Sequence, residues 1–411
     1  MILLYHKIAR LQHDYNLIGV TPDNFKYQME YLQRRYEIVP LEYAREDTVS
    51  ITFDDGFKDF YTEVYPYLSV NNIPAAIFIT TGQIGSKEEL WTSELLRTIF
   101  TGNDHKAYFH LKMPLFTYDF PAQSLDDKMT MYRVVRRLCM KSEEEVLKSI
   151  LSQLREWAKM ESDGREEYSF LSEQEIKILA EDPLVTIGAH TCNHISLGAF
   201  TEEYQEKEII RSKAELERIT GKVIRYFSYP FGRQYDYGKG TIDILKSSGF
   251  DRAYTTLNYE GRDTMYEIPR VTSPNLGQGE FESWFGRMVQ EEREAYGSQQ
   301  KQSGPVEYIG RLKEDKILLR ESGKIAIFGA GVRGKKLYQE LTAYSKEKAV
   351  VCFIDNDETK QGSSIEERPI ISVERIQELK PQIIVVNSIW EKEVVEQLIR
   401  CGARGIHWIV N

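Results

Sequence analysis

Seven short apolar runs, each about the length of a β-strand, alternate with amphipathic stretches over the first two thirds of the chain. The amphipathic stretches Thr21–Tyr36 and Thr201–Thr220 are typical of helices, and Pro22 follows Thr21 as at a helix start. Strands that alternate with helices pair in parallel, and seven such units predict an α/β barrel with function at the carboxyl ends of the strands. The runs are Ile2–His6, Val49–Asp54, Ala75–Thr81, Leu184–His190, Tyr226–Phe231, Arg252–Thr256 and Ile268–Thr272.

A long insertion, from about Gly85 to Phe170, separates the third run from the fourth. It is rich in Glu, Lys, Leu and Arg, and Trp91–Phe100 and Ser142–Met160 are typical of amphipathic helices. We therefore predict a helical insertion. Because it follows the carboxyl end of a strand, it is either a cap on the substrate side or a helical decoration without a role in the site.

Two of the runs end in residues that are able to bind a divalent metal. One ends in the adjacent carboxylates Asp54 and Asp55, and another ends in His190 and His194, four residues apart. One carboxylate and two imidazoles leave coordination positions open for water and substrate, whereas a structural zinc site is closed by a fourth protein ligand. The pattern favours a catalytic metal site, with the second carboxylate free to act as a base.

Composition narrows the class of protein. At 411 residues the chain has room for about two or three domains, and its net charge of -10 argues against a nucleic-acid binder. The four cysteines form no CxxC pair, which is typical of a reducing compartment. Met1–His6 lacks the features of a signal peptide, and no later segment is long enough without charges to span a membrane. We expect a cytoplasmic protein without a membrane span.

Four motifs lie near the ends of the runs: Thr52-Phe-Asp-Asp-Gly56, His190-Thr-Cys-Asn-His194, Arg225-Tyr-Phe-Ser-Tyr-Pro-Phe-Gly232 and Ile268-Pro-Arg-Val271. In this order they resemble the motifs of the polysaccharide deacetylases, carbohydrate esterase family four, with the NodB-homology domain. The resemblance implies a distorted (β/α)7 barrel and a hydrolase that acts on the carbon–nitrogen bond of a linear amide, the acetyl group of an N-acetylated sugar. It implies Asp55, His190 and His194 as metal ligands and Asp54 as the catalytic base.

The chemistry of these residue types agrees with that assignment. We expect Zn²⁺, with Co²⁺, Mn²⁺ or Ni²⁺ as alternatives, because a bound Zn²⁺ lowers the pKa of water to about 7 and polarises a carbonyl. Asp54 would then take the proton of the water. A backbone N–H in the turn from Tyr229 to Gly232 is expected to complete the oxyanion site, so Tyr229 and Phe231 are candidate substrate residues.

Two departures from the family pattern concern the base and the acid. Ser228 stands where members often carry an arginine that orients the base, and we predict that Arg270, from another strand, replaces it. The downstream Leu-x-x-His motif that usually supplies the general acid is absent, since His407 is the only histidine after His194. His6 is the predicted proton donor, as in a related subgroup that begins with a Tyr-His strand. The alternative is a buried or capping histidine.

A polar linker, 291–312, is predicted to separate the barrel domain, 1–290, from a small domain, 313–411. In the latter, the strand Lys324–Phe328 leads into a glycine turn and a helix, and Ala349–Ile354 is a second strand. This context is typical of the turn that holds a pyrophosphate, and it resembles the small Rossmann-like parallel α/β domains attached to sugar-modifying enzymes. The candidate nucleotide or nucleotide-sugar ligands are Gly329, Gly331, Gly334 and Asp355. The alternative is a packing or dimerisation module.

The sequence therefore predicts a metal-dependent deacetylase of an N-acetylated sugar in glycan precursor or polysaccharide biosynthesis. Deacetylation of a finished polymer, such as peptidoglycan or chitin, is an alternative. A second alternative is a non-catalytic scaffold that has kept its metal and lost its acid. A dehydrogenase or epimerase would rest on the glycine turn alone. Amide and ester hydrolysis both remain open, because they use the same metal-water chemistry.

Overall fold

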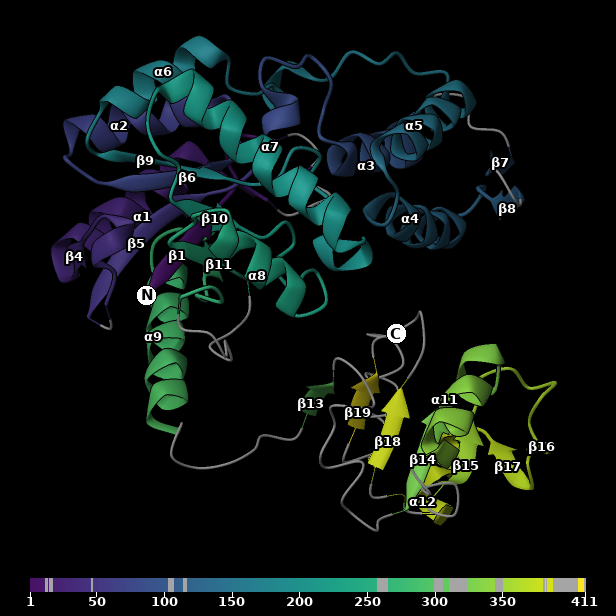
Figure 1. The fold of residues 1–411 in the computed structure, drawn as a ribbon. Helices are drawn as coiled ribbons and strands as arrows, with labels where there is room; N and C mark the ends of the chain where they lie inside the picture. Colours follow the sequence, from purple (N-terminus) through teal and green to yellow (C-terminus); the bar gives the residue numbers. More distant parts are fainter. Residues whose placement is uncertain are drawn as a thin grey trace. The chain divides into compact units, whose positions relative to one another are not determined.

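The structure is a computed structural model, and it describes residues 1–11, 14, 18–45, 47–102, 107–113, 117–256, 265–298, 306–309, 324–343, 350–379, 381, 383–386 and 406–409. The chain forms two compact units, Met1–Gly297 and Ser298–Asn411 (Figure 1).

The first unit is built around one parallel sheet in the order β11-β10-β9-β6-β5-β1-β12, with the short β4 (Glu37–Ile38) beside β5. The ends of this path approach each other where Tyr254, the last residue of β11, bridges Ile268 ahead of β12. The sheet thus forms the distorted (β/α)7 barrel that the sequence predicts, and each predicted run supplies one strand. These strands are β1 (Ile2–Tyr5), β5 (Thr48–Phe53), β6 (Ala75–Ile79), β9 (Val185–Ala189), β10 (Tyr226–Ser228), β11 (Arg252–Tyr254) and β12 (Val271–Thr272).

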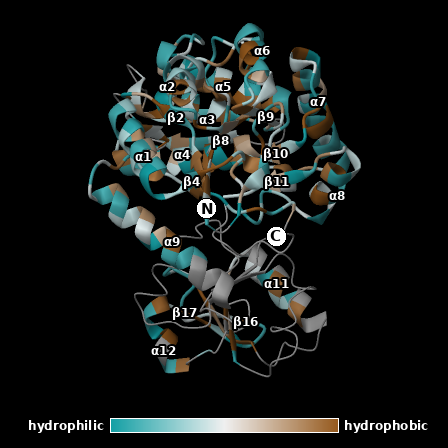
Figure 2. Ribbon diagram, turned by 90° about the vertical axis from the view of Figure 1, so that its left-hand side faces the viewer, coloured by the Kyte–Doolittle hydropathy of each residue, from teal (hydrophilic) through white to brown (hydrophobic). Residues whose placement is uncertain are grey.

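Helices cover the outer face of this sheet because each has one apolar face. In α7 the buried side chains include Ile209, Ser212 and Leu216, which recur at helical spacing, and both hydrophilic and hydrophobic residues line α7 and α8 in Figure 2. The predicted cap of α1 is confirmed, since the Thr21 hydroxyl accepts a hydrogen bond from the Asn24 N–H. The covering helices are α1 (Pro22–Arg35), α2 (Tyr65–Val70), α6 (Glu173–Glu181), α7 (Glu202–Thr220), α8 (Lys239–Ser247) and α9 (Glu280–Ser298).

Side chains of β6 alternate between two apolar clusters. Ile77 belongs to the large core between the sheet and the helices, whereas Phe78 joins Tyr226 and Tyr254 in a smaller cluster. The alternation follows from the two-residue period of a strand, and it identifies the smaller cluster as the interior of the barrel. The guanidinium of Arg270 lies 5.2 Å from the centre of the Phe78 ring, so this buried cation sits directly over the barrel interior.

The helical insertion between β6 and β9 is confirmed, and it has a core of its own. The helices α3 and α5 occupy the two stretches that the sequence predicts, whereas the hairpin β7–β8 was not expected. The strand Tyr108–Lys112 alternates exposed and buried residues, but a run of this length is too short to stand out in a sequence. The elements of the insertion are α3 (Trp91–Thr101), β7 (Tyr108–Lys112), β8 (Thr117–Pro121), α4 (Leu125–Met140) and α5 (Glu144–Ala158).

Two barrel loops contribute to the core of the insertion. Phe57 follows the Asp-Asp-Gly motif and stacks on Phe170 with a ring separation of 4.9 Å. Phe231, from the turn after β10, packs against the same cluster. The insertion therefore packs on the loops at the carboxyl ends of the strands, where a barrel places its functional residues.

The second unit contains a sheet in the order β13-β19-β18-β14-β15-β17-β16, parallel except for the pair β16–β17. Besides Lys324–Phe328 and Ala349–Ile354, which correspond to β14 and β15, the apolar runs Ile383–Val386 and Ile406–Val410 predict strands, and they correspond to β18 and β19. The sequence also predicts a helix around Glu391–Cys401, which lies outside the described residues. The elements are β13 (Val306–Ile309), β14 (Ile325–Phe328), α11 (Val332–Ala343), β15 (Val350–Ile354), β16 (Ser364–Ile365), β17 (Arg368–Ile371), α12 (Ile376–Leu379), β18 (Ile383–Val386) and β19 (Ile406–Ile409).

The range 291–312, predicted as a linker, contains the end of α9 and the whole of β13, which pairs with β19. The segment is polar, but glutamate and alanine favour a helix strongly enough to extend α9 to Ser298. Within the described ranges, no helix combines the length and the apolar character that crossing a membrane requires.

Candidate active site

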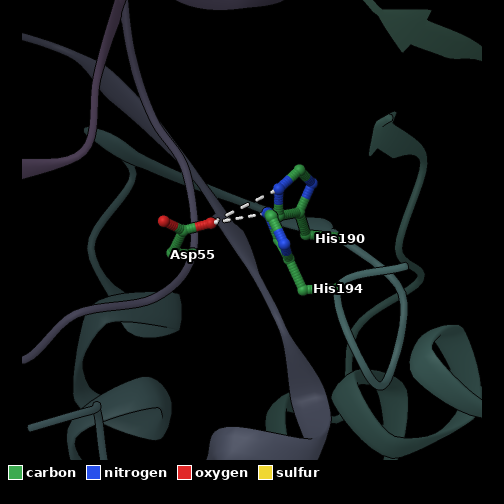
Figure 3. Close-up of side chains that lie close together, drawn as sticks. All are labelled: Asp55, His190 and His194. Carbon is green, nitrogen blue, oxygen red and sulfur yellow. Dashed lines mark ion pairs between the residues drawn. The ribbon is translucent and has the colours of Figure 1, made fainter. Parts of the chain in front are cut away.

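Three side chains from two strand ends converge on one point of the barrel rim (Figure 3). Asp55 follows β5, and His190 and His194 follow β9. The Oδ1 atom of Asp55 lies 3.2 Å from Nε2 of His194 and 3.5 Å from Nε2 of His190. All three residues are buried, and one potential ligand atom from each lies within 4.8 Å of the others. The structure thus brings together the three residues that the resemblance implies as metal ligands.

This donor set fits a divalent cation. Oδ1 of Asp55 is buried and has no hydrogen-bond partner among the described residues, although it faces two imidazole nitrogens. A buried carboxylate oxygen without a donor is costly unless a cation compensates it. One carboxylate oxygen and two imidazole nitrogens are ligands that Zn²⁺ and related ions accept, and they leave positions open for water and substrate.

The tautomer of His190 is set by its second nitrogen. Nδ1 lies 2.7 Å from the backbone oxygen of Ser228, and a carbonyl can only accept. Nδ1 therefore carries the proton, and the lone pair of Nε2 points towards Asp55, as metal-binding histidines require. The backbone N–H of His190 also donates to Ile79, so the barrel strands hold this histidine at two points.

Left-handed backbone conformations gather around the three side chains. Asp55, Thr191, His194 and Phe231 have φ values of 75°, 60°, 50° and 61°. Non-glycine residues adopt this conformation at a cost of about 1–3 kcal/mol each and keep it only where the surroundings hold it. These conformations could not be predicted from the sequence, because none of the four positions is a glycine.

Arg270 holds Asp54 through two hydrogen bonds. Its Nη1 donates to Oδ1 at 2.7 Å and its Nη2 to Oδ2 at 2.6 Å, and both side chains are buried. Nη2 also donates to the hydroxyl of Ser228, which in turn donates to Oδ2 of Asp54 at 3.0 Å. Ser228 occupies the position of the expected family arginine, and the guanidinium of Arg270 reaches Asp54 from the segment before β12.

The charges of these groups shift their protonation equilibria. Burial raises the pKa of Asp54, but the charges of Arg270 and His190 outweigh it and lower that pKa. For Asp55, burial is likewise outweighed, chiefly by His194, and the pKa falls well below its usual value. Burial lowers the pKa of His194, whereas Asp54 and Asp55 overcome burial and raise the pKa of His190. Both carboxylates are therefore ionised at neutral pH.

His6 follows β1 and is partly buried. Its Nδ1 atom is buried without a hydrogen-bond partner among the described residues. His6 directly follows Tyr5, whose backbone oxygen accepts a hydrogen bond from the N–H of Asp54 at 3.0 Å, so His6 leaves β1 beside the end of β5 that carries the carboxylates. No hydrogen bond joins His6 to either carboxylate in the described part of the chain.

The turn after β10 carries backbone donors beside the metal ligands. The N–H of Tyr229 donates to the Tyr254 carbonyl, and its hydroxyl donates to the Tyr266 carbonyl. Pro230 has no N–H. Among the described residues no hydrogen bond is found for the N–H of Phe231 or for that of Gly232, so both are open to a substrate oxygen. The ring of Phe231 lies 4.8 Å from that of His194. Of the candidates Tyr229 and Phe231, Tyr229 already uses its N–H within the barrel, and a substrate role for either residue stays a prediction.

The family model for polysaccharide deacetylases matches residues 42–253, which include both metal motifs. The chain belongs to the polysaccharide deacetylase family. The putative polysaccharide deacetylase YxkH of Bacillus subtilis is 22% identical over 301 residues, which cover 70% of this chain and 76% of that protein.

Solved deacetylase structures resemble this chain at low sequence identity. The Streptococcus pyogenes deacetylase PplD in complex with acetate is 17% identical, with a TM-score of 0.43, and the match covers 70% of this chain and 96% of that one. BC0361, a polysaccharide deacetylase from Bacillus cereus, is 17% identical, with a TM-score of 0.44 and coverage of 70% and 68%.

Two residues that the sequence did not single out support the histidine loop of this deacetylase. Glu208 of α7 accepts hydrogen bonds from the N–H groups of Cys192 and Asn193, both at 3.0 Å, and from the Asn193 side chain at 2.7 Å. Glu208 could have been recognised in the sequence as a charged residue on the apolar face of the predicted helix Thr201–Thr220. Trp91 of α3 donates its indole N–H to the carbonyl of His194 at 3.1 Å, and nothing in the local sequence indicates this contact.

The glycine turn of the second unit is shaped by close packing. A Cβ atom on Gly334 would lie 1.8 Å from the carbonyl oxygen of Gly329, whereas one on Gly331 would meet nothing within 4 Å. Oδ2 of Asp355 accepts a hydrogen bond from the Ala330 N–H at 2.7 Å. Close packing thus accounts for Gly334, and this hydrogen bond accounts for Asp355, while Gly329 has a φ of 101°.

Residues 321–407 match the family model named C2185-like, N-terminal. This comparison does not support the expected Rossmann-like nucleotide-binding domain. A nucleotide role for Gly329, Gly331, Gly334 and Asp355 stays a prediction.

Proposed function

We propose that this polysaccharide deacetylase removes the acetyl group from an N-acetylated sugar with a divalent metal bound by Asp55, His190 and His194. The observation that carries the proposal is the convergence of these ligands beside a carboxylate, Asp54, that Arg270 orients. When bound there, the metal would lower the pKa of water and polarise the acetyl carbonyl.

Asp54 has the position and charge of a general base. Its Oδ2 lies 4.0 Å from Nε2 of His190, so it borders the ligand set without completing it. Arg270 and Ser228 fix the plane of the carboxylate, and the lowered pKa keeps it ionised. In the proposed reaction, Asp54 accepts a proton from the attacking water. General base catalysis of this kind contributes about 10²–10⁴-fold to a rate.

His6 and Phe231 supply the other two functions that amide hydrolysis needs. The carbon–nitrogen bond breaks only if the leaving amine takes up a proton. His6 follows the residue that bonds the backbone of Asp54, and its buried Nδ1 has no hydrogen-bond partner among the described residues. The backbone N–H of Phe231 would donate to the oxygen of the acetyl group as its negative charge develops.

The proposed substrate is a sugar of glycan precursor metabolism in the cytoplasm, and a finished polymer is the second candidate. To distinguish them, acetate release is measured from N-acetylated nucleotide sugars and from chitooligomers, using metal-depleted protein reloaded with Zn²⁺ or Co²⁺. Asp54→Asn is the control. Metal-dependent release from a nucleotide sugar supports the precursor and a nucleotide role of the second unit. Release from oligomers alone supports the polymer, and no release with metal bound supports a non-catalytic scaffold.

A further inference from the structure

We propose that Trp91, in the inserted helix α3, is a positioning residue of the metal centre: it holds His194 in the conformation that directs its ring to Asp55. The inference rests on the proposed metal-dependent function, and it gives the insertion a role in building the site. Its basis is a hydrogen bond between residues 103 positions apart, from the indole Nε1 of Trp91 to the backbone oxygen of His194, 3.1 Å long and buried.

The backbone of His194 needs external support. Its φ of 50° lies in the left-handed region, which residues with a side chain rarely adopt. Such a conformation persists where neighbouring groups determine the orientation of the peptide units on both sides. The N–H of His194 donates to the hydroxyl of Thr191 at 3.0 Å, and the carbonyl accepts from Trp91. Together these two bonds fix the peptide groups on either side of the histidine.

The ring of His194 is supported by the same insertion. It lies 4.8 Å from the ring of Phe231, whose centre lies 6.1 Å from the ring of Trp91. The guanidinium of Arg136, on α4, lies 5.1 Å from the same Phe231 ring. Two helices of the insertion therefore hold the aromatic surface against which the His194 ring packs.

The other two ligands are held by the barrel. His190 donates from its backbone to Ile79 on β6 and from Nδ1 to the carbonyl of Ser228 on β10. Asp55, directly after β5, accepts at its backbone oxygen from the N–H of Thr80, which follows β6. Among the described residues, an inserted side chain bonds the backbone of His194 and of neither other ligand. Loss of the hydrogen bond from Trp91 should therefore loosen His194 and leave the other two metal ligands in place.

The test is metal affinity, with Trp157→Phe as the matched control for Trp91→Phe. Trp157 lies in α5 of the same insertion and also donates its indole N–H to a backbone carbonyl, that of Tyr108, at 3.0 Å. Each substitution keeps an aromatic ring and removes one indole N–H donor, buried for Trp91 and partly buried for Trp157. Affinity for Co²⁺ is measured by chelator competition, and the visible spectrum of bound Co²⁺ reports its coordination geometry.

We expect Trp91→Phe to lower Co²⁺ affinity by about 10-fold, within the range for residues that orient metal ligands, and to change the spectrum. Trp157→Phe should leave both unchanged. Equal affinities and spectra for the two variants would overturn the role of Trp91. If the parent protein bound no metal, the proposed function itself would fail. Should Trp91→Phe not fold, benzothienylalanine in place of Trp91, which keeps the fused ring and lacks the N–H, gives the same comparison.

Discussion

The guanidinium of Arg270 spans both carboxylate oxygens of Asp54 at 2.6–2.7 Å, although the two residues lie 216 positions apart. Both are buried, so neither charge is compensated by water. Removing one partner of such a pair leaves an isolated buried charge, which typically costs about 3–5 kcal/mol. The pair therefore joins β5 to the segment before β12 and orients the proposed base.

Arg270→Lys should lower kcat by about 10–100-fold, since lysine keeps the charge but cannot hold both oxygens of Asp54 in one plane. Arg225→Lys is the control, because Arg225 forms an exposed pair with Asp251 near β10. Kinetics on the acetylated substrate and the thermal midpoint are measured for both variants. Equal kcat for Arg270→Lys and the parent would remove Arg270 from the catalytic site.

The variants Asp54→Asn and Asp55→Asn should distinguish the proposed general base, Asp54, from the proposed metal ligand, Asp55. We expect Asp54→Asn to retain bound metal while kcat falls by about 10²–10⁴-fold, as for loss of a general base. Asp55→Asn should lose the metal, because a neutral amide is a poor substitute for the carboxylate. Bound metal per chain is measured after dialysis, beside kcat. Metal loss from Asp54→Asn equal to that from Asp55→Asn would contradict the assigned roles.

His6→Gln should discriminate between substrates by their leaving groups. An amine must be protonated to leave, whereas an aryl oxide leaves without a proton. We expect a loss of about 100-fold on the N-acetylated sugar and only a few-fold loss on an aryl acetate. His110→Gln, on the exposed face of β7, is the control. Parallel losses on both substrates would show that His6 supports the site rather than donating a proton.

Glu208→Gln should loosen the loop that joins the two histidines. The carboxylate accepts three hydrogen bonds, and the amide can accept at only one of its two terminal atoms. We expect a loss of about 1–3 kcal/mol in the free energy of unfolding, measured in urea, and weaker Co²⁺ binding. Glu206→Gln, exposed on the same helix, should change neither quantity.

Asp236 predicts a specific pH dependence of stability. Burial raises the pKa of this carboxyl to about 6, while Ser196 and the Arg233 N–H oppose that rise through hydrogen bonds. The folded chain thus binds this proton more tightly than the unfolded chain, and the contribution of Asp236 to stability falls as pH rises from about 4 to about 6. Between pH 4.5 and pH 7 the parent should lose about 2 kcal/mol more unfolding free energy than Asp236→Asn. Parallel pH curves in urea unfolding would contradict this assignment.

The barrel strands and the convergence of the ligands were predictable because their signals are local. Each strand is a continuous apolar run, and carboxyl ends of parallel strands meet at one rim, so Asp55 and His190 had to approach each other. The contacts of Trp91 and Glu208 with the histidine loop were not predictable. They join segments that are distant in sequence, and neither partner carries a pattern that identifies the other.

Other differences between the predictions and the structure also have physical causes. Tyr229 and Asp355 are residue types that can bind a ligand, but in the structure their donors and acceptors meet backbone groups of the protein. A sequence does not show whether a polar side chain is already satisfied. The predicted linker began at residue 291, but α9 continues to Ser298. Polar residues with high helix propensity lengthened this helix, and they leave no apolar pattern in the sequence that would predict its end.

The positions of Phe57 and Phe231 limit how far this protein can be shortened by engineering. Both lie in barrel loops beside the metal ligands, yet the ring of Phe57 belongs to the core of the insertion and the ring of Phe231 packs against that core. Trimming the chain to a minimal barrel would leave these two rings facing water next to the catalytic groups. A miniaturised catalyst, or a transplant of the catalytic loops onto another barrel, would therefore have to bring α3, α4 and α5 with it or redesign both aromatic positions.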